Sequence, residues 1–554
     1  MEDQTAFDHE SLAFKKLSHS QWTDYFLSVP ISDSELDVIT REIDILKPEV
    51  RDLISSQGDD ETLKKKVLLI QLLLSLGLAF HFENEIKDIV IHAFQRIDDI
   101  MGNEMNLSTL SSIFRVFRTY GHNISSNVFN RFAKDDGKFE ESLMEDTKGI
   151  LSLYEAAHLG TTADDIFEEA LKFTSSHLES LLEGGTCLPH VSRLIRNTLY
   201  LPQRWNMEAL VAREYISFYE QEEDHDKMLL KLAKLSFKLL QMHYIKELQT
   251  FITWWKELGV TSKMPSQFRE QIVEAWLAGL MMYFEPQYSG GRIIAAKFNY
   301  LLTILDDACD DYFSIPEITS LVDCVERWSP NDVHTLEDLS RLVFQLSLDI
   351  FEDIERGVRS QGKPYHLKEM LEELKILVRA SLDLVKWARG NKVPGFEEFV
   401  EIGGTALTTY ATLMYSFVGM GDTVGKEAYE WVRSRPRLIK SLAAKGRLMD
   451  DVTDFEKDMS NGFAANAINY YMKQFEVSKE KAMLECQKMI ADVNKTINEE
   501  LLKTTAVPCR VLKQALNFGR LLHVLYSKSD DIYNCSEGKL KEYIATLLVD
   551  PIRL

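Results

Sequence analysis

Cysteine and proline are scarce in this chain of 554 residues, which contains six cysteines and 13 prolines. The cysteines are scattered, with no CxxC pair and no spacing to histidine that suits a metal. This pattern argues against a disulfide framework and a structural zinc site, and it fits a reducing compartment. Together with only 26 glycines, the few prolines leave long segments free of helix-breaking residues.

Positive charge is also in deficit, because 63 Lys and Arg face 86 Asp and Glu, a formal net charge of −23. Nucleic acid and anionic membrane surfaces are therefore poor partners. The opening Met1-Glu2-Asp3-Gln4 is acidic and no short apolar core follows it, so it resembles neither a secretory signal nor a basic transit peptide. The longest apolar stretch, 67–80, contains Gln71 and is too short to span a bilayer. We expect a cytoplasmic protein with no nucleic-acid partner and no stable membrane association.

Apolar residues recur at three- and four-residue spacing through most of the sequence, as in Leu69, Leu72, Leu73 and Leu76. Alternating, strand-like runs are hard to find, so the pattern predicts an all-α protein. The polar stretch 220–226 is the best candidate for a domain boundary. We therefore predict an N-terminal α-helical domain over 1–222 and a C-terminal domain over 223–554.

One acidic set closes an apolar run in the predicted C-terminal domain. Asp306-Asp307-Ala308-Cys309-Asp310 follows the segment 298–305, and Asp306 and Asp310 lie one helical turn apart on one face. Burying an unpaired carboxylate costs several kcal/mol or shifts its pKa until it is protonated. A hard divalent cation with oxygen ligands avoids that cost, and Mg²⁺ held by one or two carboxylates usually has phosphate as a further ligand.

A second acidic set follows 144 positions later, counted from Asp306 to Asp450 (450 − 306 = 144). Asp450, Asp454 and Asp458 are spaced at i, i+4 and i+8, so they share one face of a helix over two turns. Either set alone could be a solvated acidic surface, as we interpret the pairs Asp98-Asp99 and Asp164-Asp165. Two sets beside apolar sequence favour a site that binds a metal-chelated phosphate.

At this point the sequence resembles a family, the class I plant terpene synthases, specifically the short cytosolic sesquiterpene synthase type. The likeness covers nearly the whole chain and rests on the two acidic sets together with several further segments. These segments are Trp22-Thr23-Asp24-Tyr25-Phe26-Leu27, His81-Phe82-Glu83-Asn84-Glu85-Ile86, Leu153-Tyr154-Glu155-Ala156, Trp254-Trp255-Lys256 and Tyr283-Phe284-Glu285-Pro286-Gln287-Tyr288.

The resemblance implies a catalytic C-terminal α-bundle preceded by a degenerate, catalytically silent N-terminal α-helical domain whose first segment caps the active site. Three Mg²⁺ ions, with Mn²⁺ as a substitute, would bind the diphosphate of a prenyl diphosphate substrate, and the enzyme would act as a monomer. An allylic cation would form and cyclise in an aromatic pocket closed to water. The activity implied is that of a carbon–oxygen lyase acting on diphosphates.

By residue, the resemblance matches Asp306, Asp307 and Asp310 to the first metal-binding motif and Asp450, Asp454 and Asp458 to the second. Arg269 and Arg447 match diphosphate-binding arginines, which grip phosphate oxygens in pairs. Asp531 and Tyr533 match the C-terminal lid. Aromatic faces stabilise a desolvated cation by ~2 kcal/mol each. The candidates for this lining are Trp276, Tyr410, Tyr415, Tyr526 and Tyr533, although for any one of them ordinary core packing is the more common explanation.

The sequence departs from the family pattern in its charges. Asp454 replaces a usual Ser or Thr, Asp458 replaces a usual Glu, and Gln271 and Asn461 stand where arginines are common. Two missing cations weaken diphosphate retention, and the added Asp charge compensates if it binds metal more tightly. A catalytically dead relative would bind the ligand and release no hydrocarbon.

Small residues bear on substrate length. Ala278 stands where many relatives carry a large aromatic residue, and Gly403-Gly404 precede an expected helix break. If these face the cavity they enlarge it, so geranylgeranyl diphosphate is the alternative to farnesyl diphosphate. Asn299 either holds a water that captures the final cation or is a hydrogen-bonded packing residue. A prenyl chain-elongating transferase and a non-enzymatic helical scaffold are the other classes considered.

Overall fold

The computed structural model describes residues 13–55, 59–266, 268–359, 365–390, 393–527, 530–533, 535 and 537–554. Helices make up nearly all of the regular structure in these ranges, which confirms the all-α prediction. The only strands in the described ranges form one short antiparallel pair, β1 (Tyr526–Ser527) and β2 (Asp530–Asp531), with Tyr526 opposite Asp531.

The N-terminal half contains ten labelled α-helices among the described residues. Their bounds are α2 (Trp22–Ser28), α3 (Asp33–Ser55), α4 (Asp60–Ser75), α5 (Glu83–Gln95), α6 (Ile97–Met101), α7 (Leu107–Thr119), α8 (Thr147–Ala157), α9 (Ile166–Gly184), α10 (Pro189–Tyr200) and α11 (Glu208–Tyr219).

The C-terminal half begins with the long helix α12. Its helices are α12 (Lys227–Leu258), α13 (Ile272–Met282), α14 (Ser289–Asp307), α15 (Ile315–Arg327), α16 (Asp338–Arg359), α17 (Tyr365–Arg389), α18 (Phe396–Ala406), α19 (Thr409–Val418), α20 (Lys426–Arg433), α21 (Arg437–Asn461), α22 (Ala467–Phe475), α23 (Lys479–Lys503), α24 (Cys509–Leu525) and α25 (Lys539–Ile544).

Short helical turns connect these elements. They are η1 (His19–Gln21), η2 (Ala79–His81), η3 (Ser126–Phe132), η4 (Glu141–Glu145), η5 (Gln203–Trp205), η6 (Thr261–Lys263), η7 (Pro286–Tyr288), η8 (Ala308–Tyr312), η9 (Pro330–Thr335), η10 (Gly421–Thr423) and η11 (Ala545–Val549). Of these, η8 and η11 are π-helical.

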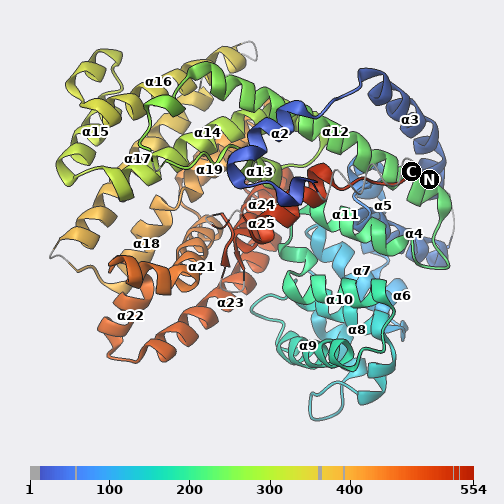
Figure 1. Ribbon diagram of the computed structural model, residues 1–554. Coiled ribbons are helices and arrows are strands. Elements are labelled where there is room, and N and C mark those ends of the chain that lie inside the picture. Colours follow the sequence, from blue (N-terminus) through green and yellow to red (C-terminus); the bar gives the residue numbers. More distant parts are fainter. Residues whose placement is uncertain are drawn as a thin grey trace.

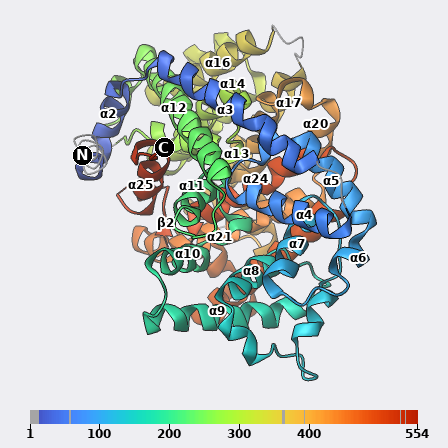
Figure 2. The same ribbon diagram turned by 90° about the vertical axis from the view of Figure 1, so that its right-hand side faces the viewer.

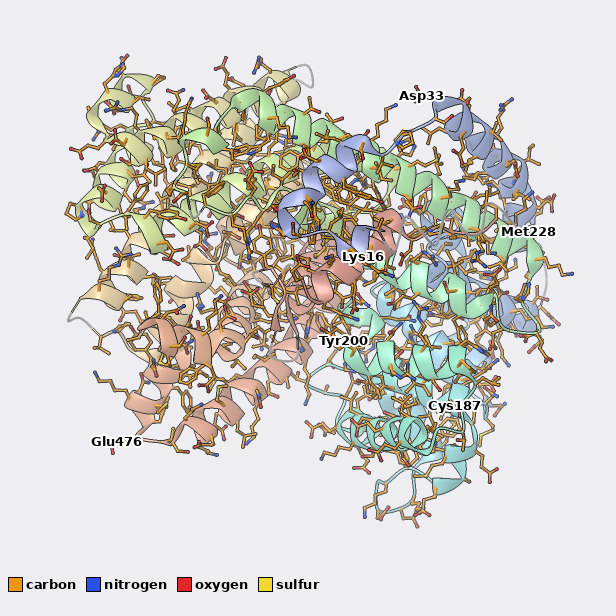
Figure 3. The ribbon with its side chains drawn as sticks, in the orientation of Figure 1. Lys16, Asp33, Cys187, Tyr200, Met228 and Glu476 are labelled. Carbon is orange, nitrogen blue, oxygen red and sulfur yellow. The ribbon has the colours of Figure 1, made fainter. Side chains whose placement is uncertain are left out.

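The two halves form two neighbouring lobes. Figure 1 shows α14–α23 on the left and α4–α10 at the lower right, and Figure 2 shows the second lobe face-on. In Figure 3 Glu476 lies at the lower end of the left lobe, and Cys187 lies within the lobe at the lower right. The predicted boundary near residue 222 coincides with the turn before α12, where the Asp226 side chain accepts hydrogen bonds from the backbone N–H groups of Met228 and Leu229. The division at 222 itself stays a prediction.

The first helices do not remain within the N-terminal lobe. Both α2 and α3 pack against α12, and α2 also contacts α13. Figures 1 and 2 show α2 beside α12 and α25. Phe14, Trp22 and Phe26 are buried in this contact region, so the N-terminal segment is docked on the C-terminal half by apolar burial.

Helix α13 forms the centre of the C-terminal half. All of its residues from Ile272 to Met282 are buried, and it packs against α12, α14 and α24. A helix that is buried on every side is typical of the core of a large domain, and Glu274 is the one charged residue on it. Among the described residues, no helix has both the length and the apolar character that a membrane span requires.

Candidate active site

One cavity of about 440 Å³ lies among α13, α14, α17, α18, α19, α21 and α24 in the C-terminal half. This volume is within the range of about 300–1,000 Å³ that is usual for small-molecule sites. Its lining divides into two chemical parts. The acidic part consists of Asp306, Asp307, Asp310, Asp311, Asp450, Asp454, Asp458 and Asp531, and the apolar part includes Ala278, Leu302, Val385, Ala406, Leu407, Phe518, Leu521, Leu522 and Leu525.

The first acidic face is carried by the end of α14 and by η8. Asp306 and Asp307 end α14, and Asp310 belongs to the π turn that follows. The sequence predicted one continuous helical face here. The wider turn is a local departure, with Phe313 N donating to Ala308 O at 2.8 Å. Such single π turns within helices are frequent at functional sites.

Arg389 of α17, which also lines the cavity, holds this turn from a neighbouring helix. Its guanidinium donates to the carbonyl oxygens of Asp310 at 2.6 Å, Phe313 at 2.5 Å and Cys309 at 3.2 Å. These bonds satisfy carbonyls that the end of a helix leaves unpaired. Sequence reasoning missed this residue, because nothing local relates Arg389 to a motif almost 80 positions earlier.

The second acidic face lies on α21, which ends where Gly462 adopts a left-handed φ of 79°. Asp450, Asp454 and Asp458 all line the cavity, as the i, i+4, i+8 spacing predicted. Asn466, the N-cap of α22, donates to Asp458 Oδ2 at 2.9 Å and to Asp451 O at 3.1 Å. It thereby holds the last carboxylate of the series in place.

Arg447 forms ion pairs with two aspartates of the same helix. Its guanidinium pairs with both Asp450 and Asp451, and the Asp451 side chain is fully buried and accepts from Ala467 N at 2.7 Å. Burial alone would lower the pKa of Arg447, but Asp451 and Asp450 raise it. Gly403 of α18 makes room for this side chain, since a Cβ there would lie 2.3 Å from Arg447 Cδ.

The acidic side chains shift one another's titration. Burial, followed by the charges of Asp310, Asp307 and Asp450, raises the pKa of Asp306 well above its ordinary value. Burial and Asp311 raise the pKa of Asp307 and of Asp310 to about 6. Asp450 is thus close enough to act on Asp306 across the cavity. The two acidic faces, far apart in sequence, confront each other.

A C-terminal turn closes another side of the cavity. Tyr533 lines the cavity, and its hydroxyl forms a hydrogen bond of 2.7 Å with Thr303 Oγ1 on α14. Arg269 and Gln271 donate to the Tyr533 carbonyl oxygen at 3.0 and 3.2 Å. Asp531 accepts from the Tyr533 backbone N–H at 3.0 Å. Tyr526, at the start of β1, also lines the cavity and hydrogen-bonds Asp450.

The donor set suits Mg²⁺. Among the described residues no three His, Cys, Asp or Glu side chains are gathered into a ready metal cage. Mg²⁺ does not require one, because it keeps several waters and takes one or two carboxylates together with phosphate oxygens. Two facing rows of carboxylates whose pKa values are raised by mutual repulsion are the arrangement that bound cations would relieve.

Comparison with known families agrees with this geometry. Residues 256–496 match the model described as "Terpene synthase family, metal binding domain", and residues 21–199 match "Terpene synthase, N-terminal domain". The chain belongs to the terpene synthase family. This confirms the family indicated by the sequence and the lyase activity on prenyl diphosphates that the family carries.

Relatives and solved structures extend the match over the whole chain. The terpene synthase is 81% identical over 554 residues, all of both chains, to "(Z)-gamma-bisabolene synthase 2" of Arabidopsis thaliana. It is 54% identical to "Alpha-barbatene synthase" of the same plant, over 99% of each chain. The crystal structure of isoprene synthase from grey poplar leaves in complex with three Mg²⁺ ions and dimethylallyl-S-thiolodiphosphate superposes with a TM-score of 0.85. It is 26% identical and covers 96% of this chain and 99% of that one.

The terpene synthase brings together most of the predicted site residues. All six predicted metal-binding aspartates, with Arg447, Tyr526, Asp531 and Tyr533, line the one cavity. Arg269 is not among the lining residues and instead contacts the backbone of Tyr533. Its predicted contact with diphosphate stays a prediction.

Trp276 is not among the residues that line the cavity, and its place in the aromatic pocket stays a prediction. Its side chain is fully buried and packs edge-on against Tyr244, with 5.8 Å between the ring centroids. Tyr410 lies under the Arg435 guanidinium, 3.6 Å from its ring, and Tyr415 hydrogen-bonds Asn299, so neither lines the cavity. Of the candidate aromatic residues, Tyr526 and Tyr533 line the cavity.

The expectation about small residues is half correct. Ala278 lines the cavity. Gly403 and Gly404 do not; they let α18 approach α21, because a Cβ on Gly404 would lie 2.7 Å from the Ala443 carbonyl oxygen. Close helix packing, and not pocket size, explains this glycine pair.

The raised pKa values predict a pH dependence. Between the ordinary value of 3.8 and about 6, the folded state holds protons on Asp307 and Asp310 that the unfolded chain releases. The metal-free enzyme should therefore lose stability as pH rises through this window. Mg²⁺ with pyrophosphate should raise the melting temperature more at about pH 7.5 than at about pH 5.5, because the ligands must be deprotonated. A thermal shift that is independent of pH would contradict this; Asp310→Asn should flatten the dependence.

Proposed function

We propose that this terpene synthase ionises and cyclises farnesyl diphosphate to a sesquiterpene and releases diphosphate. The observation that carries the proposal is that one cavity combines facing carboxylate rows with a continuous set of apolar side chains. The carboxylates suit a metal-bound diphosphate, and the apolar part suits a hydrocarbon chain. No water-accessible nucleophile is needed for such a reaction, whose cationic intermediates survive only where water is excluded.

The substrate length is supported by the relatives' names. A relative named as a (Z)-gamma-bisabolene synthase, a sesquiterpene synthase, is 81% identical to this chain over its whole length. A sesquiterpene is therefore the expected product. The C20 alternative, geranylgeranyl diphosphate, rests on Ala278, whose small side chain lines the cavity.

Three Mg²⁺ ions, as named for the isoprene synthase complex, would be held by Asp306, Asp307 and Asp310 on one side and by Asp450, Asp454 and Asp458 on the other. When bound, the metal supplies Lewis-acid stabilisation of the departing diphosphate. Mn²⁺, which prefers similar oxygen ligands, should substitute. Arg447 orients Asp450 through its ion pair, so that this carboxylate faces the cavity.

The apolar side chains hold the hydrocarbon chain in a folded conformation, and two aromatic rings lie where they can stabilise the positive charge of the carbocation. Tyr526 and Tyr533 line the cavity, and their faces can stabilise a cation by ~2 kcal/mol each. Thr303 and the carbonyl contacts of Arg269 and Gln271 keep Tyr533 in place. Asp531 and Tyr533 thereby limit the entry of water at this side of the cavity.

Asn299 bears on whether water captures the final cation. Its amide oxygen accepts from Tyr415 OH and its nitrogen donates to Ala275 O at 3.4 Å. Asn299 lines the cavity, but both of its polar atoms are engaged with the protein, which favours the packing interpretation of this residue over a water-holding one. We therefore propose a hydrocarbon and not an alcohol as the main product. We also propose a cytoplasmic monomer that binds neither nucleic acid nor membranes stably.

The direct test is incubation of the purified enzyme and Mg²⁺ with C10, C15 and C20 prenyl diphosphates, followed by mass spectrometry of the extracted products. A C15 hydrocarbon formed only with farnesyl diphosphate and metal is the expected result. A C20 product formed with the higher kcat/KM would favour the alternative. A stabilising response to Mg²⁺ and pyrophosphate without any product would identify a catalytically dead relative.

The added charge at Asp454 should strengthen metal binding. Its carboxylate lines the cavity beside Lys457, whose ammonium is 3.5 Å from Asp454 Oδ2. Asp454→Ser should raise the Mg²⁺ concentration for half-maximal activity by about tenfold, equivalent to ~1.4 kcal/mol of lost attraction. Titration of activity against Mg²⁺ measures this. Glu456→Ser, on the exposed side of the same helix away from the cavity, is the matched control. An unchanged or lower Mg²⁺ requirement in Asp454→Ser would refute the compensation hypothesis.

A further inference from the structure

Residues 13–28, here called the N-terminal segment, lie against the C-terminal half at a defined place. In Figure 3 Lys16 lies near the middle of the view, at the junction of α2 with the C-terminal helices. Apolar burial of Phe14, Trp22 and Phe26 holds the segment broadly in position. Such contacts are not directional, so its exact register depends on polar contacts.

His19 makes the most buried of these polar contacts. Its Nε2 lies 2.6 Å from Glu274 Oε1, and the Glu274 side chain is fully buried on α13. The other carboxylate oxygen, Oε2, has no hydrogen-bond partner among the described residues. A buried carboxylate without a partner is strongly unfavourable. His19 is therefore the residue that makes the burial of Glu274 tolerable.

The same residue also contacts the C-terminal end of the chain. The His19 backbone N–H donates to Glu537 Oε1 at 3.0 Å. Lys541 of α25 donates to Glu537 Oε2 at 2.7 Å and to the Leu17 carbonyl oxygen at 2.6 Å. These bonds close a ring between the N-terminal segment and residues 537–541. Both chain ends are thus held by one small polar cluster.

Residues of this cluster are close along the chain to those that hold Tyr533 at the cavity. Glu274 stands one helical turn after Gln271, which lines the cavity and donates to the Tyr533 carbonyl oxygen. On the other side, Glu537 follows Tyr533 by four positions. His19 therefore contacts both α13, whose Gln271 donates to Tyr533, and the segment of the chain that follows Tyr533.

We propose that His19 is a positioning residue that fastens the N-terminal segment to Glu274 and Glu537 and so keeps Tyr533 against the cavity while the carbocation exists. His19 does not line the cavity and touches no reacting atom. The inference rests on the proposed function for its catalytic consequence, although the fastening itself can be measured without substrate.

The test compares His19→Ala with His19→Gln, whose amide can still donate to Glu274. Hydrogen exchange of residues 13–28 and 537–541 should accelerate by about tenfold in His19→Ala, the loss of one hydrogen bond to a charged group. With farnesyl diphosphate, the ratio of alcohol to hydrocarbon products should rise severalfold, because water gains access. His19→Gln should restore both quantities most of the way toward the wild type.

Asp24→Ala provides the matched control on the same segment. Asp24 pairs with Lys256 at 2.8 Å, but both side chains are largely exposed, and such pairs contribute little. This variant should keep the wild-type exchange rates and product ratio. If His19→Ala fails to fold, Glu537→Ala replaces it, because Glu537 is exposed and a substitution there should be tolerated. This variant should also raise the hydrogen-exchange rates of the two segments and the ratio of alcohol to hydrocarbon products.

Wild-type exchange and products in His19→Ala, or in Glu537→Ala where that replaces it, would overturn the proposal. The proposal would also be overturned if Asp24→Ala changed hydrogen exchange and the product ratio as much as His19→Ala does. That outcome would show that loosening the segment at any position has this effect. A wild-type enzyme that converts no prenyl diphosphate would refute the proposed function separately. The exchange comparison would then still decide whether His19 fastens the segment.

Discussion

Asp306→Asn is expected to lower kcat by about 10³-fold or more, equivalent to ~4 kcal/mol, without weakening the fold. The substitution preserves the size of the side chain and removes one carboxylate from the centre of the acidic face. Because burial and three neighbouring aspartates raise the pKa of Asp306, its ionisation opposes folding when no metal is bound. The metal-free variant should therefore melt at or above the wild-type temperature at about pH 7.5.

Asp98→Asn is the control for Asp306→Asn. Asp98 belongs to α6 and is exposed, so the change should leave kcat and the melting temperature within error of the wild type. Steady-state kinetics with farnesyl diphosphate and a melting curve with and without Mg²⁺ supply both readings. A fully active Asp306→Asn enzyme would show that the Asp306 carboxylate is not required for the reaction.

Arg447→Ala is expected to have the largest effect on stability, a loss of about 3–5 kcal/mol, as is usual when one partner of a buried ion pair is removed. It leaves Asp451, whose side chain is fully buried, without its cation. The remaining contact from the Ala467 backbone N–H does not neutralise the charge. Urea unfolding followed by circular dichroism measures the loss.

The double variant Arg447→Ala with Asp451→Asn separates charge from packing. Removing the stranded carboxylate should recover more than half of the lost stability while activity stays low, because Asp450 has lost its orienting partner as well. No recovery in the double variant would mean that the guanidinium acts by filling space next to Gly403, and not by pairing charge. Arg447→Lys should be intermediate, since an ammonium cannot make the same forked contact.

The helical fold and the acidic faces could be predicted because both depend on local spacing. Apolar residues at three- and four-residue intervals indicate helices. Asp450, Asp454 and Asp458 share a face by helical geometry alone. That both sets line one cavity followed from the cost of burying like charges, and the structure agrees.

What escaped prediction depends on contacts between distant segments. Arg389 reaches the carbonyl oxygens of η8 from another helix, and His19 reaches Glu274 across 255 positions. The sequence also cannot distinguish a buried aromatic residue of the core, such as Trp276, from one that faces a cavity. Gly403 was interpreted as space for substrate, whereas the space is occupied by Arg447.

The central claim is that metal ions lie between the two carboxylate rows and hold a diphosphate there. Crystals grown with Mn²⁺ and pyrophosphate, with anomalous diffraction recorded at the manganese edge, test it directly. The account predicts anomalous peaks within coordination distance of Asp306 or Asp310 on one side and of Asp450, Asp454 or Asp458 on the other, with pyrophosphate oxygens completing the ligands. Pyrophosphate bound without any peak in this cavity, or manganese only at the outer surface, would contradict it.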